Sequence, residues 1–351
     1  MAAPQVVVYT TPPEALVEVL ARSHRLLTLP LIRRLQFAAK FPGGITEHAR
    51  ILWCSRVALE EHPLLGARQR DSGEVGVVEG AKDEEGEKEV PFAAVYLDFS
   101  RGPETELWIY SSMERRFYGT EDGLGREKEE SKEKGEKEPS NLEREEIACA
   151  VVLLREVKRQ QDLYFVPGSP QAAEREFQTI LIGNLNEVLR ERLVAPDVRM
   201  DIVSTGLYDK WIFEVGKLPD VKLPEVLIGS DGEGRRWAWD IVRKEDVAFT
   251  ISRTKIPRKE RTMKLLSSKA LYLDDGKPIA WAFLGPDSSL SSLHCEEAYR
   301  GRGIAKAVAV RVLRDHLKDY GGDAYYGWAD VAPDNLQSQS ESYELGHELS
   351  E

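Results

Sequence analysis

The sequence has few cysteines, no long apolar run and no excess of basic residues, and each shortage excludes a class of protein. Three cysteines, Cys54, Cys149 and Cys295, are too few and too widely spaced for a disulfide framework or a metal quartet, so reduced thiols and no metal are expected. No apolar stretch approaches the length of a membrane span, and the amino terminus lacks a basic start followed by a hydrophobic run. The net charge of −12, from 48 basic and 60 acidic residues, disfavours nucleic acid and anionic membranes as partners. A cytoplasmic or nuclear protein is expected.

The negative charge is concentrated in two runs rich in Glu, Lys and Gly, near residues 71–90 and 119–143. Their low apolar content predicts disordered insertions. At 351 residues the chain is long enough for two domains with cores of their own. A stretch that contains Pro and Gly, residues 216–236, is expected to link an N-terminal domain, 1–215, to a C-terminal domain, 237–351.

A glycine-containing turn in the C-terminal domain is the most informative local feature. Residues 290–295 alternate apolar and small polar side chains, which predicts a strand, and apolar residues recur every three or four positions from residue 304 onward, which predicts a helix. A turn between a strand and a helix leaves unpaired N–H groups at the positive end of the helix dipole, and glycine allows an anion to approach them. The predicted pyrophosphate site consists of Arg300, Gly301, Arg302, Gly303, Ile304 and Ala305.

Other glycine motifs fit this turn less well. A dinucleotide fold requires Gly or Ala at the sixth position of its motif, where this chain has Lys306. A Walker loop requires Gly-Lys followed by Ser or Thr, and an RNA-binding Arg-Gly tract requires repetition in a basic segment, and neither is found here. An ordinary strand-to-helix turn remains the alternative for the hexapeptide taken by itself.

The surroundings of the turn complete a family pattern. A hairpin is predicted over residues 269–284, before the turn. After the turn, a strand is predicted over residues 324–331 and a helix from residue 335 onward. With Arg-x-x-Gly-x-Ala at 300–305 and Asn335-x-x-Ser338, this order resembles the GNAT superfamily of acyl-CoA-dependent N-acyltransferases. Within the superfamily, the C-terminal part of the chain is most similar to proteins that resemble glycine N-acyltransferases.

The resemblance implies a fold as well as an activity. We expect an α/β (α+β) protein with two tandem GNAT-like domains, each a mixed, mostly antiparallel sheet flanked by helices. The N-terminal domain would be degenerate, because its acidic insertion falls where a phosphate turn would lie. The C-terminal domain would bind acyl-CoA and carry out catalysis. It looks truncated, since the family closes its sheet with two further strands after the position where this chain ends.

The resemblance also implies the residues that bind the cosubstrate, acetyl-CoA or another acyl-CoA, besides those of the turn. The backbone at Leu293 and Cys295 would pair with the pantetheine arm and the thioester oxygen. Asn335 and Ser338 would lie near the pantetheine. Two simpler roles stay open, because Cys295 can serve packing alone and Asn335 can serve as a helix cap.

Catalysis would require a base that takes a proton from the attacking amine and an acid that protonates the departing thiolate. The positions where some relatives have a glutamate base hold serine in this chain, which leaves His294 and Glu296 as candidates. Strand alternation places both on the face opposite the proposed CoA positions, so the face that meets the acceptor decides their role. Tyr343 is the candidate acid, although it lies one residue past the position that spacing from Asn335 selects.

Several interpretations of the function follow. The first is transfer of an acetyl or other acyl group from acyl-CoA to the primary amine of a small, amino-acid-like molecule. The alternatives are a module that binds acyl-CoA without turnover and an enzyme that acetylates a protein amine. Basic residues over 253–264 either bind the 3′-phosphate of CoA or an acceptor carboxylate, or form a solvated loop. The oligomeric state is left open.

Overall fold

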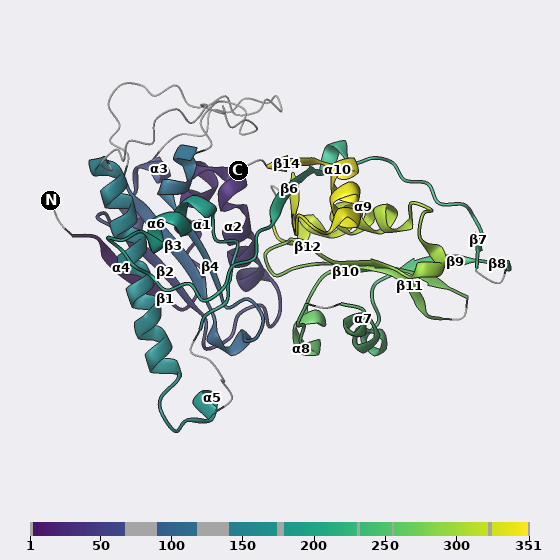
Figure 1. Cartoon of the computed structure of the whole chain (residues 1–351), viewed down its shortest axis with the longest axis horizontal. Helices are drawn as coiled ribbons and strands as arrows, with labels where there is room; N and C mark the ends of the chain where they lie inside the picture. Colours follow the sequence, from purple (N-terminus) through teal and green to yellow (C-terminus); the bar gives the residue numbers. More distant parts are fainter. Residues whose placement is uncertain are drawn as a thin grey trace. The chain divides into compact units, whose positions relative to one another are not determined.

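The computed structural model describes residues 3–66, 90–117, 140–173, 179–229, 232–254, 256–274, 276–321 and 325–349. The chain divides into two compact units, each with its own sheets and helices (Figure 1). The first unit comprises Met1–Leu35, Ile45–Thr205 and Ser350–Glu351, and the second comprises Gln36–Gly44 and Gly206–Leu349. The insertions expected near 71–90 and 119–143 fall almost entirely outside the described residues. Within the described part, no helix combines the length and apolar character needed to cross a membrane.

The first unit is a five-stranded sheet with the order β1-β2-β3-β4-β5, antiparallel except for the parallel pair β4 and β5. Its strands are β1 (Gln5–Tyr9), β2 (Arg50–Ser55), β3 (Phe92–Leu97), β4 (Leu107–Ser111) and β5 (Ile182–Gly183). Its helices are α1 (Glu14–Ser23), α2 (Arg25–Lys40, which belongs to the second unit from Gln36), α3 (Pro63–Gly66), α4 (Asn141–Tyr164), α5 (Pro170–Ala173) and α6 (Glu187–Val194).

Helices cover both faces of this sheet because its strands are apolar on both sides. In β3, Ala93 and Val95 point to one face and pack in a cluster with residues of α4. Tyr96 points to the other face, where the guanidinium of Arg34 from α2 lies 3.7 Å from the centre of its ring. All six residues of β3 are buried, as expected for a central strand between two helical layers.

The second unit contains an antiparallel sheet β12-β11-β10-β9, a three-stranded sheet β13-β6-β14 and a short pair β7-β8. The strands are β6 (Asp209–Glu214), β7 (Leu227–Ile228), β8 (Gly234–Arg235), β9 (Trp237–Asp240), β10 (Ser268–Leu273), β11 (Pro278–Leu284), β12 (Leu290–Cys295), β13 (Tyr326–Val331) and β14 (His347–Leu349). The helices are α7 (Val247–Ser252), α8 (Glu260–Met263), α9 (Ile304–His316) and α10 (Leu336–Leu345).

The four-stranded sheet lies between two helical layers, with α9 on one face and α7 and α8 on the other (Figure 1). Alternation along β11 divides the core accordingly. Ala280 and Ala282 pack in the cluster that contains the buried residues of α9. Trp281 and Phe283 pack in a second cluster with residues of α7 and α8.

Both units follow the same order of elements. A strand is followed by two helices, three antiparallel strands, a long helix and a strand parallel to the one before that helix. If the four-residue helices α3 and α5 are left aside, these are β1, α1, α2, β2, β3, β4, α4 and β5 in the first unit, and β9, α7, α8, β10, β11, β12, α9 and β13 in the second. The expected α/β fold with two tandem domains of mixed, mostly antiparallel sheet is therefore confirmed.

The boundary between the units differs from the expected one. Residues 209–214 form β6, which pairs antiparallel with β13 and β14 of the second unit, so the division falls at 205/206 instead of 215/216. The expected linker, 216–236, is part of the second unit. Leu218 and Leu227 are 4% and 1% exposed within its core, because apolar side chains in this segment have a surface to pack on.

Strand β6 covers the edge of β13. It lies between β13 and β14 and pairs along the whole of β13, from Tyr326↔Glu214 to Val331↔Asp209. The covering strand thus comes from the segment before the domain, which the sequence interpretation left out. Pairing satisfies the backbone groups that an exposed edge strand would present.

Candidate active site

Strands β12 and β13 are parallel neighbours that meet at one point and then separate. An isolated parallel bridge joins Ser289 to Trp328, and the indole Nε1 of Trp328 donates to the carbonyl oxygen of Asp287 at 2.9 Å. Beyond this bridge, the described pairing of β12 is with β11, and that of β13 is with β6. The backbone of β12 that faces β13 is therefore free to pair with an extended ligand.

A bulge in β12 accompanies this separation. Ser292 has a left-handed φ of 52°, and the register with β11 shifts so that Ser292 and Leu293 together oppose Ala282. A bulge bends its strand, increases the local twist and interrupts the ladder, and bulges are frequent next to active sites. The sequence analysis missed this feature. The two adjacent serines, Ser291 and Ser292, interrupt the alternation of the strand and are the signal that could have indicated the bulge.

The glycine turn opens α9 as predicted. Gly301 and Gly303 have φ of 72° and 71°, a conformation that glycine adopts without strain, and Gly303 is the residue before the first turn of the helix. A Cβ on Gly301 would meet no atom within 4 Å, and one on Gly303 would meet only Val221, at 4.0 Å. The first amides of a helix have no intrahelical partner, and at α9 the cap residue Gly303 offers no side chain to accept a hydrogen bond from them. This arrangement fits a bound pyrophosphate.

Two arginines attach the turn to its surroundings through backbone carbonyls. Arg300 Nε donates to the carbonyl oxygen of Cys295 at 2.9 Å, and Arg302 donates to the carbonyl oxygens of Ala298, at 3.2 Å, and Ile228. Neither guanidinium uses a carboxylate in these bonds, so each keeps a positive charge near the turn. That charge favours an anionic ligand.

Leu293 and Cys295 lie on the side of β12 that faces α9. Leu293 packs against the cluster around α9, and Cys295 is 6% exposed within it. Burial, with a contribution from Glu341 and against the opposing effect of Arg300, raises the pKa of the Cys295 thiol to about 11. Cys295 is therefore a protonated packing residue at neutral pH, and its backbone is what it can offer to a ligand.

Asn335 caps α10. Its Oδ1 accepts a hydrogen bond from the Ser338 N–H at 3.2 Å, so Asn335 serves as the N-cap of the helix, and a contact with the pantetheine remains a prediction. Tyr343 is 77% exposed and contacts the ring of Trp211 on β6, with 6.4 Å between ring centres. These contacts do not bring Tyr343 together with His294 or Glu296.

Glu341 on α10 is a titratable residue that the sequence analysis missed. Burial and the neighbouring Glu344 raise the pKa of its carboxyl, and Lys306 opposes them. The charge of Glu341 in turn contributes to the raised pKa of the Cys295 thiol at the carboxyl end of β12. Spacing offered a signal, since Glu341 follows Ser338 by three residues on the same side of the helix.

His294 and Glu296 lie on the opposite face of the sheet, toward α7 and α8, as the alternation predicts. The imidazole of His294 stacks on Trp281, with 4.6 Å between ring centres and 22° between planes. Glu296 accepts a hydrogen bond from Arg253 Nε at 2.9 Å, and its Oε1 lies 3.6 Å from His294 Nε2. Burial lowers the pKa of His294, while the opposing effect of Glu296 is countered by Arg300 and Arg253. At neutral pH the imidazole is uncharged and can accept a proton.

The basic residues over 253–264 do not act as one surface. Arg253 is bonded to Glu296, and Lys264 forms an ion pair with Glu260 at 2.5 Å. Arg258 instead contacts β12, because its Nη2 donates to Ser291 Oγ at 2.9 Å. Lys255, which belonged to the same predicted patch, lies outside the described residues.

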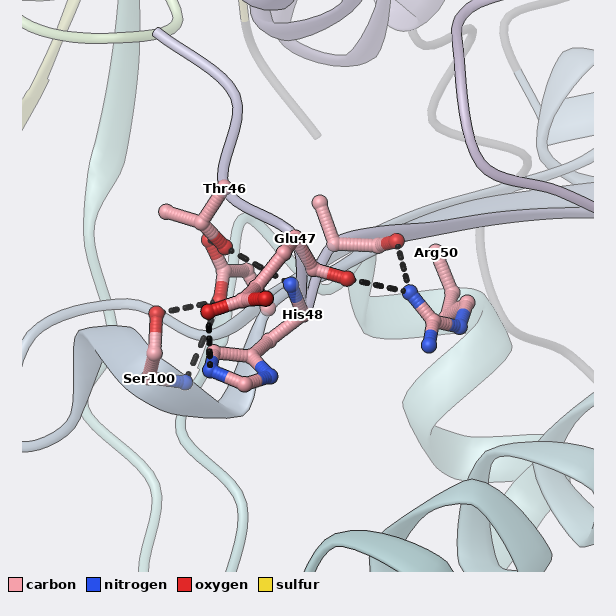
Figure 2. A network of polar contacts seen from close by, with 7 residues as sticks. Thr46, Glu47, His48, Arg50 and Ser100 are labelled. Atoms are coloured by element: carbon pink, nitrogen blue, oxygen red, sulfur yellow. Dashed lines mark hydrogen bonds and ion pairs between the residues drawn. The ribbon is translucent and has the colours of Figure 1, made fainter. Parts of the chain in front are cut away.

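The polar network of Figure 2 lies in the first unit and connects the segment before β2 to the segment after β3. The buried carboxylate of Asp98 accepts hydrogen bonds from Thr46 Oγ1 at 2.9 Å and from the N–H and Oγ of Ser100 at 3.1 and 2.7 Å. Arg50 donates to the carbonyl oxygens of Glu47 and Ala49. Because these polar groups are bonded to one another, we assign the network a structural role in fixing the two loops. Across the described part of the chain, no cluster of three or more His, Cys, Asp or Glu side chains could hold a metal ion.

Comparison with known proteins identifies the family. A family model described as the acyl-CoA N-acyltransferase verG N-terminal domain matches residues 3–211, more than half of the chain. This chain belongs to that family of acyl-CoA N-acyltransferases. The resemblance to acyl-CoA N-acyltransferases of the GNAT superfamily that the sequence indicated is thereby confirmed. Acyl-CoA is the cosubstrate of the family. The match covers the first unit, whereas the glycine turn lies in the second.

Two solved structures are similar to the N-acyltransferase over almost its whole length. One is a Drosophila protein from a structural genomics consortium, with 12% identity, a TM-score of 0.49, and coverage of 97% of this chain and 94% of that chain. The other is a tandem GNAT protein from the clavulanic acid biosynthesis pathway, solved without acetyl-CoA, with 10% identity, a TM-score of 0.42, and coverage of 98% and 96%. No curated protein matches the sequence.

Proposed function

We propose that this protein transfers an acetyl or other acyl group from acyl-CoA to the primary amine of a small, amino-acid-like molecule, by direct attack of the amine on the thioester. The observation that carries the proposal is the uncapped, glycine-opened start of α9 after a bulged strand that separates from its parallel neighbour. Such a site offers amides to a diphosphate and an unpaired strand backbone to an extended arm.

The residues of the turn would hold the CoA pyrophosphate through backbone N–H groups, from Arg300 to Ala305. The backbone at Leu293 and Cys295 would accompany the pantetheine and stabilise charge on the thioester oxygen. The side-chain Oδ1 of Asn335 is used in the helix cap, which leaves its side-chain NH₂ group to contact the pantetheine arm. Ser338, one turn later on α10, would lie near the same arm.

The acceptor would bind on the face of β12 where His294 lies. A neutral imidazole there takes the proton from the attacking amine, and the stacked Trp281 fixes the ring plane. Glu296 is paired with Arg253, which favours a role in orienting His294 over a role as the base itself. For protonation of the thiolate, the raised pKa of the partly buried Glu341 favours this residue over the exposed Tyr343.

The test is release of free thiol from acetyl-CoA, followed with a thiol reagent in the presence and absence of a panel of amines. We expect thiol release that depends on an amine and falls at least tenfold in His294→Ala. Acyl-CoAs of increasing chain length define the donor, and a peptide panel tests a protein amine as acceptor. Protection against heating by CoA without thiol release from any amine would instead establish a binding module that lacks turnover.

A further inference from the structure

Arg258 differs from Arg253 and Lys264 in the same segment, which are paired with Glu296 and Glu260, in that no described acidic residue pairs with it. It lies in the segment between α7 and α8, and its Nη2 donates to Ser291 Oγ of β12 at 2.9 Å. Its Nε is buried without a hydrogen-bond partner, and the guanidinium forms no ion pair with any of the described residues. Arginine stays charged at all physiological pH values, and a buried donor left unpaired costs about 1–3 kcal/mol.

A second unpaired atom lies on the same strand. His294 Nε2 is also buried without a hydrogen-bond partner, since the 3.6 Å to Glu296 Oε1 exceeds hydrogen-bond length. Ser291 pairs with Phe283 and His294 pairs with Trp281, and both aromatic residues belong to the cluster on the α7 and α8 face. Ser291, which accepts the hydrogen bond from the guanidinium, and His294 thus lie along one face of β12, opposite positions of β11 that are two residues, or about 7 Å, apart along the strand.

We infer that Arg258 binds the carboxylate of the acceptor and thereby selects an amino acid whose amine then lies at His294. This inference rests on the proposed function. The backbone of an α-amino acid spans about 4 Å from nitrogen to carboxylate oxygen, and two hydrogen bonds of about 2.9 Å extend this reach to at most about 10 Å. A short amino acid is therefore long enough to extend between two strand positions about 7 Å apart, from a partner of Ser291 to His294. Arginine suits this role because its planar donors match a carboxylate.

The surrounding charges favour an anion at Arg258. Glu296, the acid nearest to His294, is neutralised by Arg253, and Arg300 adds positive charge from the turn. The 3′-phosphate of CoA is the other anion that a guanidinium could bind. The α7 and α8 face lies across the sheet from α9, whose start forms the proposed pyrophosphate site, so the acceptor is the better match.

The experiment compares amino acids with the amines that lack their carboxylate, namely glycine with methylamine and alanine with ethylamine. In Arg258→Gln we expect KM for the amino acids to rise at least tenfold, while kcat changes little and the kinetics with the two simple amines and the affinity for CoA stay unchanged. Arg258→Lys should recover part of the loss, because it restores the charge without the planar donors. Arg236→Gln, at an exposed arginine of the same unit, is the matched control and should behave as the wild type.

A second measurement keeps this inference separate from the activity itself. We expect N-acetylglycine to add thermal protection to the CoA-bound wild type, and the addition to disappear in Arg258→Gln while protection by CoA alone remains. If no amine supports thiol release but this dependence on Arg258 is found, the proposed turnover fails and the carboxylate site stands. The inference is overturned if Arg258→Gln weakens CoA binding instead, which would identify the 3′-phosphate as the ligand. It is also overturned if Arg258→Gln raises KM for the simple amines as much as for the amino acids, or if N-acetylglycine adds no thermal protection to either the wild type or Arg258→Gln.

Discussion

Replacement of Gly303 by valine tests the central feature of the proposed site. The φ of Gly303 is 71°, and a left-handed conformation costs an L-residue roughly 1–2 kcal/mol. The nearest atom to an added Cβ would be Val221 Cγ1 at 4.0 Å, so strain and not overlap would account for the loss of stability. For a unit of this size, the loss corresponds to a fall in Tm of about 2–8 °C.

The effect of the same change on CoA should be larger. The new side chain would stand in the open space through which an anion approaches the first-turn amides of α9. Hydrogen bonds to charged groups contribute about 1.5–3 kcal/mol each, so displacement of the diphosphate from two amides costs about 3 kcal/mol or more. We therefore expect Kd for CoA to rise by about a hundredfold or more, measured by isothermal titration.

Gly276 is the matched control for this prediction. Its φ is 81°, an added Cβ would meet no atom within 4 Å, and it lies in the turn between β10 and β11. Gly276→Val should lose a similar amount of stability and keep the wild-type affinity for CoA. If the two variants have the same Kd for CoA, the diphosphate does not lie at the start of α9, and the site assignment is wrong.

Three further predictions concern the rest of the second unit. Gly346→Ala should destabilise the protein by about 1–3 kcal/mol in chemical denaturation, because its Cβ would lie 2.1 Å from the carbonyl oxygen of Ile212 on β6, and Gly216→Ala, with open space around it, should have no such effect. Asn335→Ala should cost about 1 kcal/mol in the same assay through loss of the cap on α10, and an unchanged stability would show that the cap does not form in solution. In the pH profile of kcat/KM, activity should rise with pH through a midpoint below 6.5, because burial lowers the pKa of the His294 base that must be neutral to act, and His294→Gln should remove this limb. A midpoint that remains in His294→Gln would assign the base to another group.

Local patterns were sufficient for the elements next to the site. The alternation over residues 290–295 predicted β12, and the change to a spacing of three and four residues predicted that α9 begins at residue 304. The two glycines predicted a turn between strand and helix that an anion can approach, and the structure gives both of them a positive φ. Each of these depends on neighbours within a few positions along the chain, so the residue types alone carry the information.

The roles of individual polar residues needed three-dimensional contacts. Nothing in the spacing of Arg253, Arg258 and Glu296 shows that the first is paired with the third while the second reaches Ser291. Burial decided the rest, since the low pKa of His294 and the raised pKa of Glu341 arise mainly from desolvation by residues distant in sequence.

The sequence by itself determined the strand, the glycine turn and the helix at residues 290–316, and the family to which the motifs point. Only the tertiary structure decided that residues 209–214 insert between β13 and β14, across more than a hundred intervening residues. An apolar strand is compatible with many sheet edges, and the partner it takes depends on which edge the folded domain leaves uncovered. The same holds for the bulge at Ser292, which is a relation between two strands and not a property of either one.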